Sequence, residues 1–409
     1  MARNPVVSDS LNWRLPEGVE DLLPPAAWAL EQVRRRVLDI FHRAGFDYIE
    51  PPVIEYLDAL LVGSGGDLDL QTLKVVDQRS GRLLGVRADL TSQAARIDAH
   101  SLPDAGVRRL CYAGTVVHAN PAGVLESRIP EKAGAEIFGA PSLAADAEVI
   151  TLLLDVLHAA GLAHPVLVLG HVGIYQHLVA PLGLPADRER QLFAAVQSKS
   201  QTDIAQLLDA YPGAAGIIAL PTLMGRRAVL AKARDALADA PAEVLRALDS
   251  LSELADSVAA RVPGVDLRFD LAELAGYGYH NGPVFTAYQG ERGNARARGT
   301  AIARGGRYDG IGAAFGRARP ATGFDINLKQ LLAADALAGD AVPERAVWVP
   351  WSSNTAEGLQ ADERSARIRA LRAAGEIVIV ALAADETAPA RCDRVLVHRA
   401  DGWSVEPRN

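Results

Sequence analysis

Patterns typical of β-strands come in two groups along this chain, and a long helical block separates them. Strand patterns lie between residues 46 and 170 and again between residues 265 and 303. Residues 186–260 carry successive Ala- and Leu-rich helical patterns interrupted by Gly and Pro, which indicates a helical insertion. Because strands and helices come in runs and do not strictly alternate, the sequence predicts an α+β fold with a largely antiparallel sheet flanked by helices.

The same patterns predict a core that the helical insertion divides. The core comprises residues 1–184 and 263–335, and the insertion comprises residues 185–262. Asp335–Glu344 is rich in small and acidic residues, which is typical of a linker. Beyond it, residues 341–409 predict a small C-terminal α/β domain. A length of 409 residues fits two or three domains.

Hydrophobic periodicity predicts several individual elements. Apolar residues at helical spacing predict helices at Ala26–Ala44 and Ala144–Ala160. We also expect a strand at Leu110–Val117 and a helix at Phe324–Ala333 that closes the core.

Composition excludes several classes of protein. Hydrophobic residues make up 49% of the chain, so it is not largely disordered, and no apolar stretch approaches the ~20 residues that span a bilayer. Two cysteines without a CxxC spacing exclude a disulfide framework and a cysteine-rich zinc site. The 42 basic and 50 acidic residues give a net charge of −8, which fits poorly with a nucleic-acid-binding surface. Residues 1–12 show no secretory signal, and we expect a cytoplasmic protein without a metal or other cofactor.

Two glycine-rich segments, Arg304–Gly310 and Gly276–Gly282, are either tight turns or ligand-binding loops. Neither has the spacing of a known nucleotide-binding motif, so composition alone favours a turn as much as a site. The second segment, however, places glycines and an amide beside two tyrosines and a histidine. Because glycine lets a backbone come close to a ligand, this segment is a candidate binding loop for a small polar molecule.

Two acidic residues occupy positions that call for a partner or a ligand. Asp89, with Thr91, lies where a strand pattern passes into a helix pattern, which suits either a helix N-cap or a ligand site. Glu136 lies in the strand pattern Gly134–Phe138, where an unpaired buried charge is costly. We therefore expect Glu136 to have a structural arginine, such as Arg128, or a cationic ligand as its partner.

Taken in this order, these segments resemble the catalytic core of histidyl-tRNA synthetases, a family of class II aminoacyl-tRNA synthetases. The resemblance covers about residues 15–335. It includes segments similar to the family's N-terminal segment, its motif 1, its amino-acid-binding strand and its two histidine-specific motifs: Glu17–Pro24, Phe46–Pro52, Arg87–Thr91, Tyr279–His280 and Gly305–Gly310. The resemblance implies a class II synthetase-like sheet and a homodimer formed through the motif 1 region.

The positions that a synthetase needs for catalysis depart from the family pattern. By resemblance, His118 and Asn120 replace the arginine and glutamate of motif 2, and Gln330 replaces the ATP-binding arginine of motif 3. The additional catalytic arginine of the first histidine-specific motif corresponds to Ala275. Preorganised cations stabilise the charge that develops on the reacting phosphate, and loss of one such group costs about 3–4 kcal/mol. We therefore expect neither aminoacylation nor tRNA binding.

A non-catalytic family matches the local sequence more closely. Leu84–Thr91, Ala95–His100, Arg109–Gly114 and Gly316–Gly323 resemble the regulatory subunits of short-form ATP phosphoribosyltransferases. The resemblance implies a catalytic partner subunit that condenses ATP with phosphoribosyl pyrophosphate in the first step of L-histidine biosynthesis. It also implies a hetero-octamer in which this chain is required for activity and transmits feedback inhibition by L-histidine, its effector.

The same resemblance implies a histidine site. Asp89 and Thr91 would bind the α-amino group, while Glu136 and Tyr279 would face the imidazole, with His280 and Tyr308 beside it. A free amino acid also needs a cation for its carboxylate, and our hypothesis is that Lys132, which stands where the family has a glutamine, supplies it. In the alternative, Lys132 pairs with Glu131 or Glu136 and the pocket is degenerate.

Two other functions are compatible with the sequence. One is a stand-alone histidine-binding sensor with a synthetase-like fold, and the other is a divergent enzyme that activates histidine. The missing arginines argue against the second.

Overall fold

The computed structural model describes residues 14–62, 66–102, 106–121, 127–162, 164–274, 276–290, 301–333, 345–352, 359–400 and 402–408. The chain folds into two compact units that divide after Leu337. The predicted linker Asp335–Glu344 lies outside the described residues.

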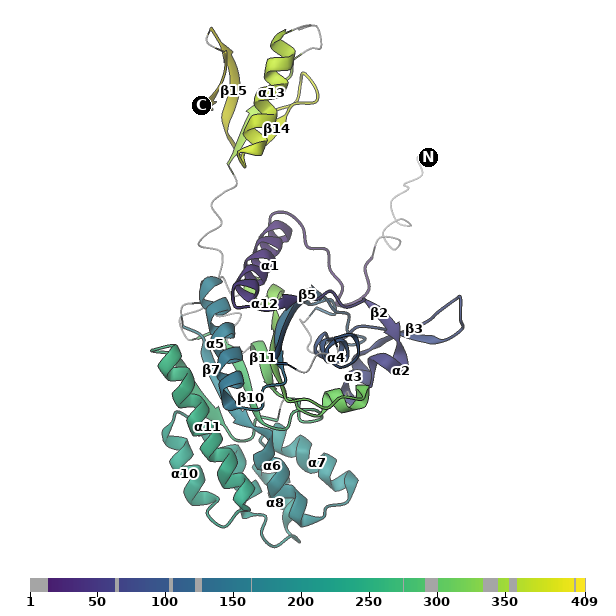
Figure 1. Cartoon of the computed structure of the whole chain (residues 1–409), viewed down its shortest axis with the longest axis vertical. Helices are drawn as coiled ribbons and strands as arrows, with labels where there is room; N and C mark the ends of the chain where they lie inside the picture. Colours follow the sequence, from purple (N-terminus) through teal and green to yellow (C-terminus); the bar gives the residue numbers. More distant parts are fainter. Residues whose placement is uncertain are drawn as a thin grey trace, which may run out of the picture. The chain divides into compact units, whose positions relative to one another are not determined.

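The larger unit is built on a nine-stranded sheet (Figure 1). Its strands, in spatial order, are β1 (Asp47–Tyr48), β5 (Arg108–Thr115), β6 (Glu131–Phe138), β12 (Ala321–Asn327), β11 (Ala301–Arg307), β10 (Pro283–Tyr288), β7 (Val166–His171), β9 (Asp266–Asp270) and β8 (Met224–Gly225). Among these described strands, only the neighbours β1–β5 and β7–β9 are parallel. The predicted α+β class, with a largely antiparallel sheet, is confirmed.

Three long helices cover one face of this sheet: α1 (Ala26–Arg43), α5 (Leu143–Ala159) and α11 (Ala242–Arg261). The spacing of Val33, Val37 and Phe41 places all three on one buried side of α1. Phe41 meets Phe324 of β12 edge to face, with ring centroids 5.8 Å apart. The main hydrophobic core therefore lies between these helices and the face of the sheet that carries Phe324.

The other face of the sheet is partly covered by α4 (Thr91–Arg96), which a π-helical turn (Ile97–Ser101) continues (Figure 1). Near α4 lies a second sheet of three strands in the order β2 (Ile54–Tyr56), β4 (Leu83–Val86) and β3 (Leu73–Val76), with the short helices α2 (Leu57–Leu60) and α3 (Gly66–Gln71). Gly85 of β4 allows α2 to pack closely, since a Cβ there would lie 2.6 Å from Cδ2 of Leu60. One face of the small sheet is thus covered by its own helix.

The chain between β7 and β9 is largely helical. It forms α6 (Val172–Val179), α7 (Ala186–Gln197), α8 (Gln201–Leu208), α9 (Ala215–Ala219), α10 (Ala228–Ala236) and α11, with 3₁₀ turns at Ala180–Leu182 and Leu220–Thr222. The two-residue strand β8 is an exception, because it pairs with β9 and extends the main sheet. None of the described helices, here or elsewhere, is both long and apolar enough to cross a membrane.

The smaller unit is a four-stranded sheet with one described helix. It contains β13 (Ala346–Val349), α13 (Leu359–Ala373), β14 (Ile377–Val380), β15 (Cys392–Arg399) and β16 (Gly402–Pro407), in the strand order β14-β13-β15-β16. Strand β13 is parallel to both of its neighbours, whereas β15 and β16 form an antiparallel pair. Val347, Val349 and Leu396 form its core with Ile368 and Leu371 of α13.

Two predictions near the end of the larger unit were wrong in part. The helix expected at Phe324–Ala333 is a strand as far as Asn327, and only Leu328–Ala333 forms a helix, α12. Here β12 pairs with β11 on one side and β6 on the other. Phe324 and Ile326 point to one face of the sheet and Gly323 and Asp325 to the other, so the chain stays extended. Similarly, Gly305 and Gly306 do not form a turn, because β11 continues through them to Arg307, whereas Gly310 does lie in a turn.

A buried ion pair fixes the end of β11 to the start of α5. The guanidinium of Arg307 donates to Oδ2 of Asp146 at 2.6 and 3.1 Å and to the carbonyl oxygens of Ala140 and Ser142 at 3.2 and 3.1 Å. The side chains of Arg307 and Asp146 are only 8% and 1% exposed. We expect Arg307→Met to lower the free energy of unfolding by about 3–5 kcal/mol, because it leaves a buried carboxylate unpaired.

Urea unfolding of the full chain measures this loss. The matched control is Arg190→Met, which removes the ion pair between Arg190 and Asp187. These two side chains are 74% and 82% exposed, so we expect the free energy of unfolding to change by less than about 0.5 kcal/mol. Equal effects of the two substitutions would contradict a structural role for Arg307.

Candidate functional site

Glycines on three adjacent strands let polar side chains converge on the sheet face opposite α1. Glu136 of β6 is in register with Gly323 of β12, which is in register with Gly306 of β11. A Cβ at Gly323 would lie 1.5 Å from Oε2 of Glu136, and a Cβ at Gly306 would lie 3.0 Å from Nε2 of His280. A Cβ at Gly134 would lie 2.5 Å from the hydroxyl of Tyr112. Side chains at these positions would displace the groups that now meet there.

Glu136 is the centre of this arrangement. Its carboxylate is fully buried, and the hydroxyls of Tyr112 and Tyr308 donate to it at 2.9 and 2.5 Å. The hydroxyls of Thr91 and Tyr112 lie 3.1 Å apart, within hydrogen-bond distance. We call Asp89, Thr91, Tyr112, Glu136, Tyr279, His280 and Tyr308 the Glu136 cluster.

The expectation that Arg128 partners Glu136 was wrong. Arg128 donates instead to the backbone carbonyl oxygens of His118 and Glu17, at 3.0 and 3.2 Å. Two phenols satisfy the buried carboxylate in place of a cation. Sequence reasoning also missed Tyr112, whose only signal is its place on a predicted strand two residues from buried Leu110.

Burial raises the pKa values of both carboxyl groups of the cluster. Burial raises the pKa of Glu136 to about 8, and the charge of Asp89 adds to the increase, although hydrogen bonds from Tyr308 and Tyr112 oppose it. Burial, and then the charge of Asp325, also raises the pKa of Asp89. In the described residues no group of three or more His, Cys, Asp or Glu side chains could hold a metal ion. The surplus of carboxylates therefore suits a ligand that brings N–H donors or positive charge.

Asp89 lies just before α4, and its carboxylate accepts hydrogen bonds from the backbone there. Helix α4 begins at Thr91 and has no side-chain cap at Leu90. Oδ2 of Asp89 accepts one long hydrogen bond, 3.4 Å, from the backbone N–H of Ser92.

Tyr279 and His280 complete the cluster from a separate loop. Their ring centroids are 4.3 Å apart, and each lies 6.4 Å from the ring centroid of Tyr308. His280 is buried, whereas Tyr279 is 39% exposed. Gly276, with φ +69°, is required for this packing, because a Cβ there would lie 2.3 Å from Nδ1 of His280. The structure thus brings together the predicted residues Thr91, Glu136, Tyr279, His280 and Tyr308.

Lys132 lies on the same sheet face and is already paired. Its ammonium contacts the carboxylate of Asp325 on β12, and the two side chains are 24% and 25% exposed. The partners considered from the sequence were wrong, since Glu131 accepts a hydrogen bond from Thr115 at 2.6 Å and Glu136 binds the two tyrosines. Asp325 was not predicted because its partner is distant in the sequence.

The described positions that lack the synthetase charges make local structural contacts. Nε2 of His118 lies 3.2 Å from the carbonyl oxygen of Ala88. Asn120 lies in an exposed bend, and the backbone N–H of Gln330 donates to Oδ1 of Asn327 at 3.3 Å. Ala275 lies outside the described residues. Lys329, next to Gln330, pairs with Glu20 at 2.7 Å, so its charge is neutralised by the protein.

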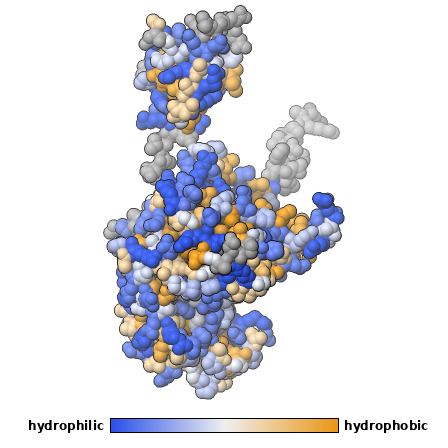
Figure 2. Space-filling view, in the orientation of Figure 1, coloured by the Kyte–Doolittle hydropathy of each residue, from blue (hydrophilic) through white to orange (hydrophobic). Residues whose placement is uncertain are grey.

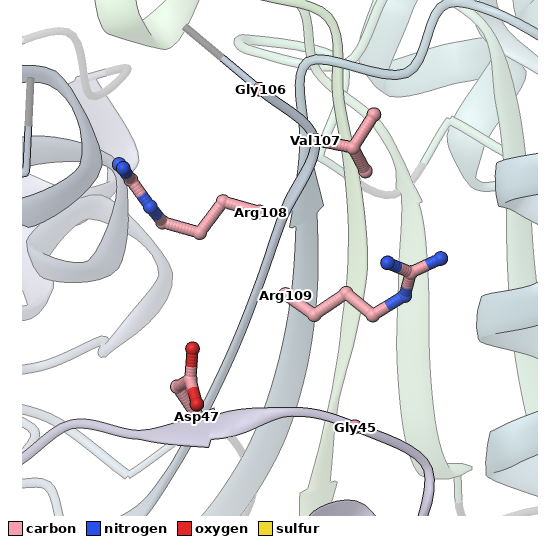
Figure 3. Close-up of a pocket in the computed structure, with 6 residues that line it drawn as sticks. All are labelled: Gly45, Asp47, Gly106, Val107, Arg108 and Arg109. Atoms are coloured by element: carbon pink, nitrogen blue, oxygen red, sulfur yellow. The ribbon is translucent and has the colours of Figure 1, made fainter. Parts of the chain in front are cut away.

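A separate pocket of about 300 Å³ lies at the β1–β5 edge of the sheet (Figure 3). Gly45, Asp47, Gly106, Val107, Arg108 and Arg109 line it. The side chains of Arg108 and Arg109 point to opposite sides of β5 (Figure 3), and Arg108 is engaged by Asp98 at 2.8 Å. No member of the Glu136 cluster lines this pocket.

The raised pKa of Glu136 predicts a distinct pH dependence of stability. Between its ordinary pKa of 4.5 and about 8, the folded protein binds the Glu136 proton more tightly than the unfolded chain does, so this group destabilises the fold as pH rises. Glu136→Gln lacks this penalty. From pH 5 to pH 8 its stability relative to wild type should therefore rise by a few kcal/mol, at about 1.4 kcal/mol per pKa unit. Urea unfolding at both pH values checks this, and exposed Glu253→Gln should show no such change.

The comparisons with sequence families cover both units. Residues 18–331 match the histidyl-tRNA synthetase family, and residues 344–406 match the family described as the ATP phosphoribosyltransferase subunit HisZ C-terminal domain. Among solved structures, one from Bacillus halodurans, titled an ATP phosphoribosyltransferase regulatory subunit/histidyl-tRNA synthetase, has a TM-score of 0.78 at 26% identity, covering 95% of this chain and 96% of that one. The histidyl-tRNA synthetase of Nostoc, at 18% identity and a TM-score of 0.75 over 97% of this chain and 95% of that one, shares the fold.

Curated relatives match this chain over nearly its whole length. The ATP phosphoribosyltransferase regulatory subunit of Pseudomonas paraeruginosa is 48% identical over 401 residues, covering 97% of this chain and 98% of the relative. The protein of the same name from Teredinibacter turnerae is 46% identical, covering 96% and 98% of the two chains. The chain therefore belongs to the family of ATP phosphoribosyltransferase regulatory subunits.

Proposed function

We propose that this chain is the non-catalytic regulatory subunit of a short-form ATP phosphoribosyltransferase and acts in the first step of L-histidine biosynthesis. In this role it binds the catalytic subunit in a hetero-octamer, is required for its activity and transmits feedback inhibition by L-histidine. The observation that carries the proposal is the near-full-length similarity to regulatory subunits, in both the synthetase-like unit and the C-terminal unit.

The state of the basic residues supports a chain without aminoacylation activity. His118, Asn120 and Gln330 stand where the resemblance places the motif 2 and motif 3 groups of a synthetase. The lysines on nearby strands and helices do not replace them, because Lys132 is paired with Asp325 and Lys329 with Glu20. A net charge of −8 is also unfavourable for binding tRNA.

The Glu136 cluster supports L-histidine as the effector. Asp89 and the hydroxyl of Thr91 suit an α-ammonium group, because the half-buried carboxyl group of Asp89 is held by backbone N–H groups and can still accept from a ligand. The carboxylate of Glu136 suits an imidazole N–H, with Tyr308, Tyr279 and His280 around it. In this arrangement Lys132 belongs to the wall of the site and holds Asp325 in place.

Reconstitution with the catalytic subunit tests the proposal. We expect the two chains to co-purify, the catalytic subunit to be nearly inactive alone and active with this chain, and L-histidine to inhibit the complex. Activity is measured as the ATP- and phosphoribosyl-pyrophosphate-dependent formation of pyrophosphate, with D-histidine as the control ligand. A catalytic subunit that is fully active alone and does not bind this chain would contradict the proposal. Histidine binding without any partner would then favour a stand-alone sensor, and histidine-dependent ATP–pyrophosphate exchange would favour a divergent synthetase.

The small sheet supports a homodimer. Ile54 and Leu73 are each in register with Val86, and Tyr56 and Val75 are each in register with Leu84, so all four lie on one face of that sheet. They are 54%, 36%, 41% and 46% exposed, respectively. Figure 2 shows hydrophobic residues gathered behind the hydrophilic tip of the β3–β4 hairpin. We propose that this face and the motif 1 segment Phe46–Pro52 pack against a second copy of the chain.

A charged substitution on this face tests the homodimer. We expect Val75→Glu to convert the chain from dimer to monomer, because burial of an unpaired carboxylate at the interface is unfavourable. Sedimentation velocity measures the change. Leu382→Glu is the control, because Leu382 lies in the smaller unit and is 80% exposed. A dimer that withstands Val75→Glu would place the interface elsewhere.

A further inference from the structure

On the sheet face of the Glu136 cluster, one arginine has no hydrogen-bond or ion-pair partner among the described residues. Arg304 of β11 is in register with Asp325 of β12. The same row across the sheet continues through Gly134 of β6 to Tyr112 of β5. Residues that pair in register point to the same face of a sheet. Arg304 therefore projects from the face that carries Tyr112 and Glu136, two residues before Gly306, which packs against His280.

Other cations in this part of the described chain form ion pairs. Lys132 pairs with Asp325, Lys329 with Glu20, and Arg307 with Asp146. Arg304 is exposed, and no hydrogen bond or ion pair joins its guanidinium to any residue in the described ranges.

The charge of Arg304 reaches the cluster. Burial raises the pKa of the Tyr279 hydroxyl, the carboxylates of Asp89, Asp325 and Glu136 raise it further, and the guanidinium of Arg304 acts in the opposite direction. The phenol of Tyr279 thus lies within the field of both the carboxylates and the arginine. A ligand beside Tyr279 would therefore be near both negative and positive charge.

We propose that Arg304 binds the α-carboxylate of the amino acid held by the Glu136 cluster. This inference rests on the proposed function, and it replaces Lys132 as the carboxylate-binding residue. A zwitterionic α-amino acid fits the charges, with its ammonium at Asp89 and Thr91, its imidazole at Glu136 and its carboxylate at Arg304. A free guanidinium offers a planar pair of N–H donors that matches a carboxylate, whereas Lys132 would first have to leave Asp325.

Calorimetric titration of the full chain with two ligands tests this assignment. L-histidine carries the carboxylate, and L-histidinol has a neutral hydroxymethyl group in its place. We expect Arg304→Gln to weaken L-histidine binding about 10- to 100-fold, the effect of losing a charge-assisted hydrogen bond. L-histidinol should bind wild type and Arg304→Gln equally. Lys132→Gln, which tests the lysine hypothesis, should weaken L-histidine less than about 3-fold. The control is Arg190→Gln, an exposed arginine of α7, which should bind L-histidine as wild type does.

Each of the other outcomes excludes either the role of Arg304 or the binding of L-histidine. If Arg304→Gln binds L-histidine as wild type does, or loses both ligands equally, Arg304 does not bind the carboxylate, although histidine remains the effector. If Lys132→Gln alone weakens L-histidine, the original lysine hypothesis is correct. If wild-type protein does not bind L-histidine at all, both the effector assignment and the role of Arg304 fail.

Discussion

A buried carboxylate held by two phenols organises the face of the sheet on which the candidate site lies. Glu136 is fully buried, yet its partners are the hydroxyls of Tyr112 and Tyr308 and include no cation. Several other features are needed for that arrangement. Gly323 must be a glycine because a Cβ there would overlap Oε2 of Glu136. Tyr308 is placed by β11, whose last residue, Arg307, is tied to α5 through Asp146. The core on the helical face and the site on the other face are therefore coupled through one strand end.

The same sheet face shows how a fold shared with histidyl-tRNA synthetases can serve a regulatory chain. Transfer of an aminoacyl or phosphoryl group needs preorganised cations directed at the developing negative charge. Here two lysines of this region form ion pairs with the protein's own carboxylates: Lys132 with Asp325 and Lys329 with Glu20. Carboxyl groups of the Glu136 cluster and the exposed guanidinium of Arg304 lie on this face beside those pairs. The groups that bind a small molecule and the groups that activate it chemically are thus separable.

The sequence predicted those features that depend on local pattern and missed those that depend on strand register. Helices α1 and α5 were predicted within one residue because their apolar residues repeat at helical spacing and are buried. Part of strand β12 was predicted as a helix. Its extended conformation follows from its pairing with β6 and β11, which places Phe324 and Ile326 on one face of the sheet and Gly323 and Asp325 on the other. The resemblance supplied Glu136, Tyr279, His280 and Tyr308, which do meet. It did not supply Tyr112, Asp325 or Arg304, whose positions follow from which residues of distant strands face each other.

The raised pKa of Glu136 influences which ligand side chain would bind beside this carboxyl group. Near pH 7 a carboxyl group with a pKa of about 8 is mostly protonated, and a free imidazole, with an ordinary pKa near 6.5, is mostly neutral. A single proton can then reside either on the carboxyl group of Glu136 or on the imidazole. The imidazole can therefore enter the site as a neutral group, without the cost of removing a charge from water. A lysine or arginine side chain would enter as a cation, with a desolvation cost that an ion pair with ionised Glu136 offsets only in part. An amide offers a donor but cannot take up the proton when the carboxyl group ionises. Among polar side chains, imidazole is therefore the one that suits a buried carboxyl group whose pKa lies close to its own.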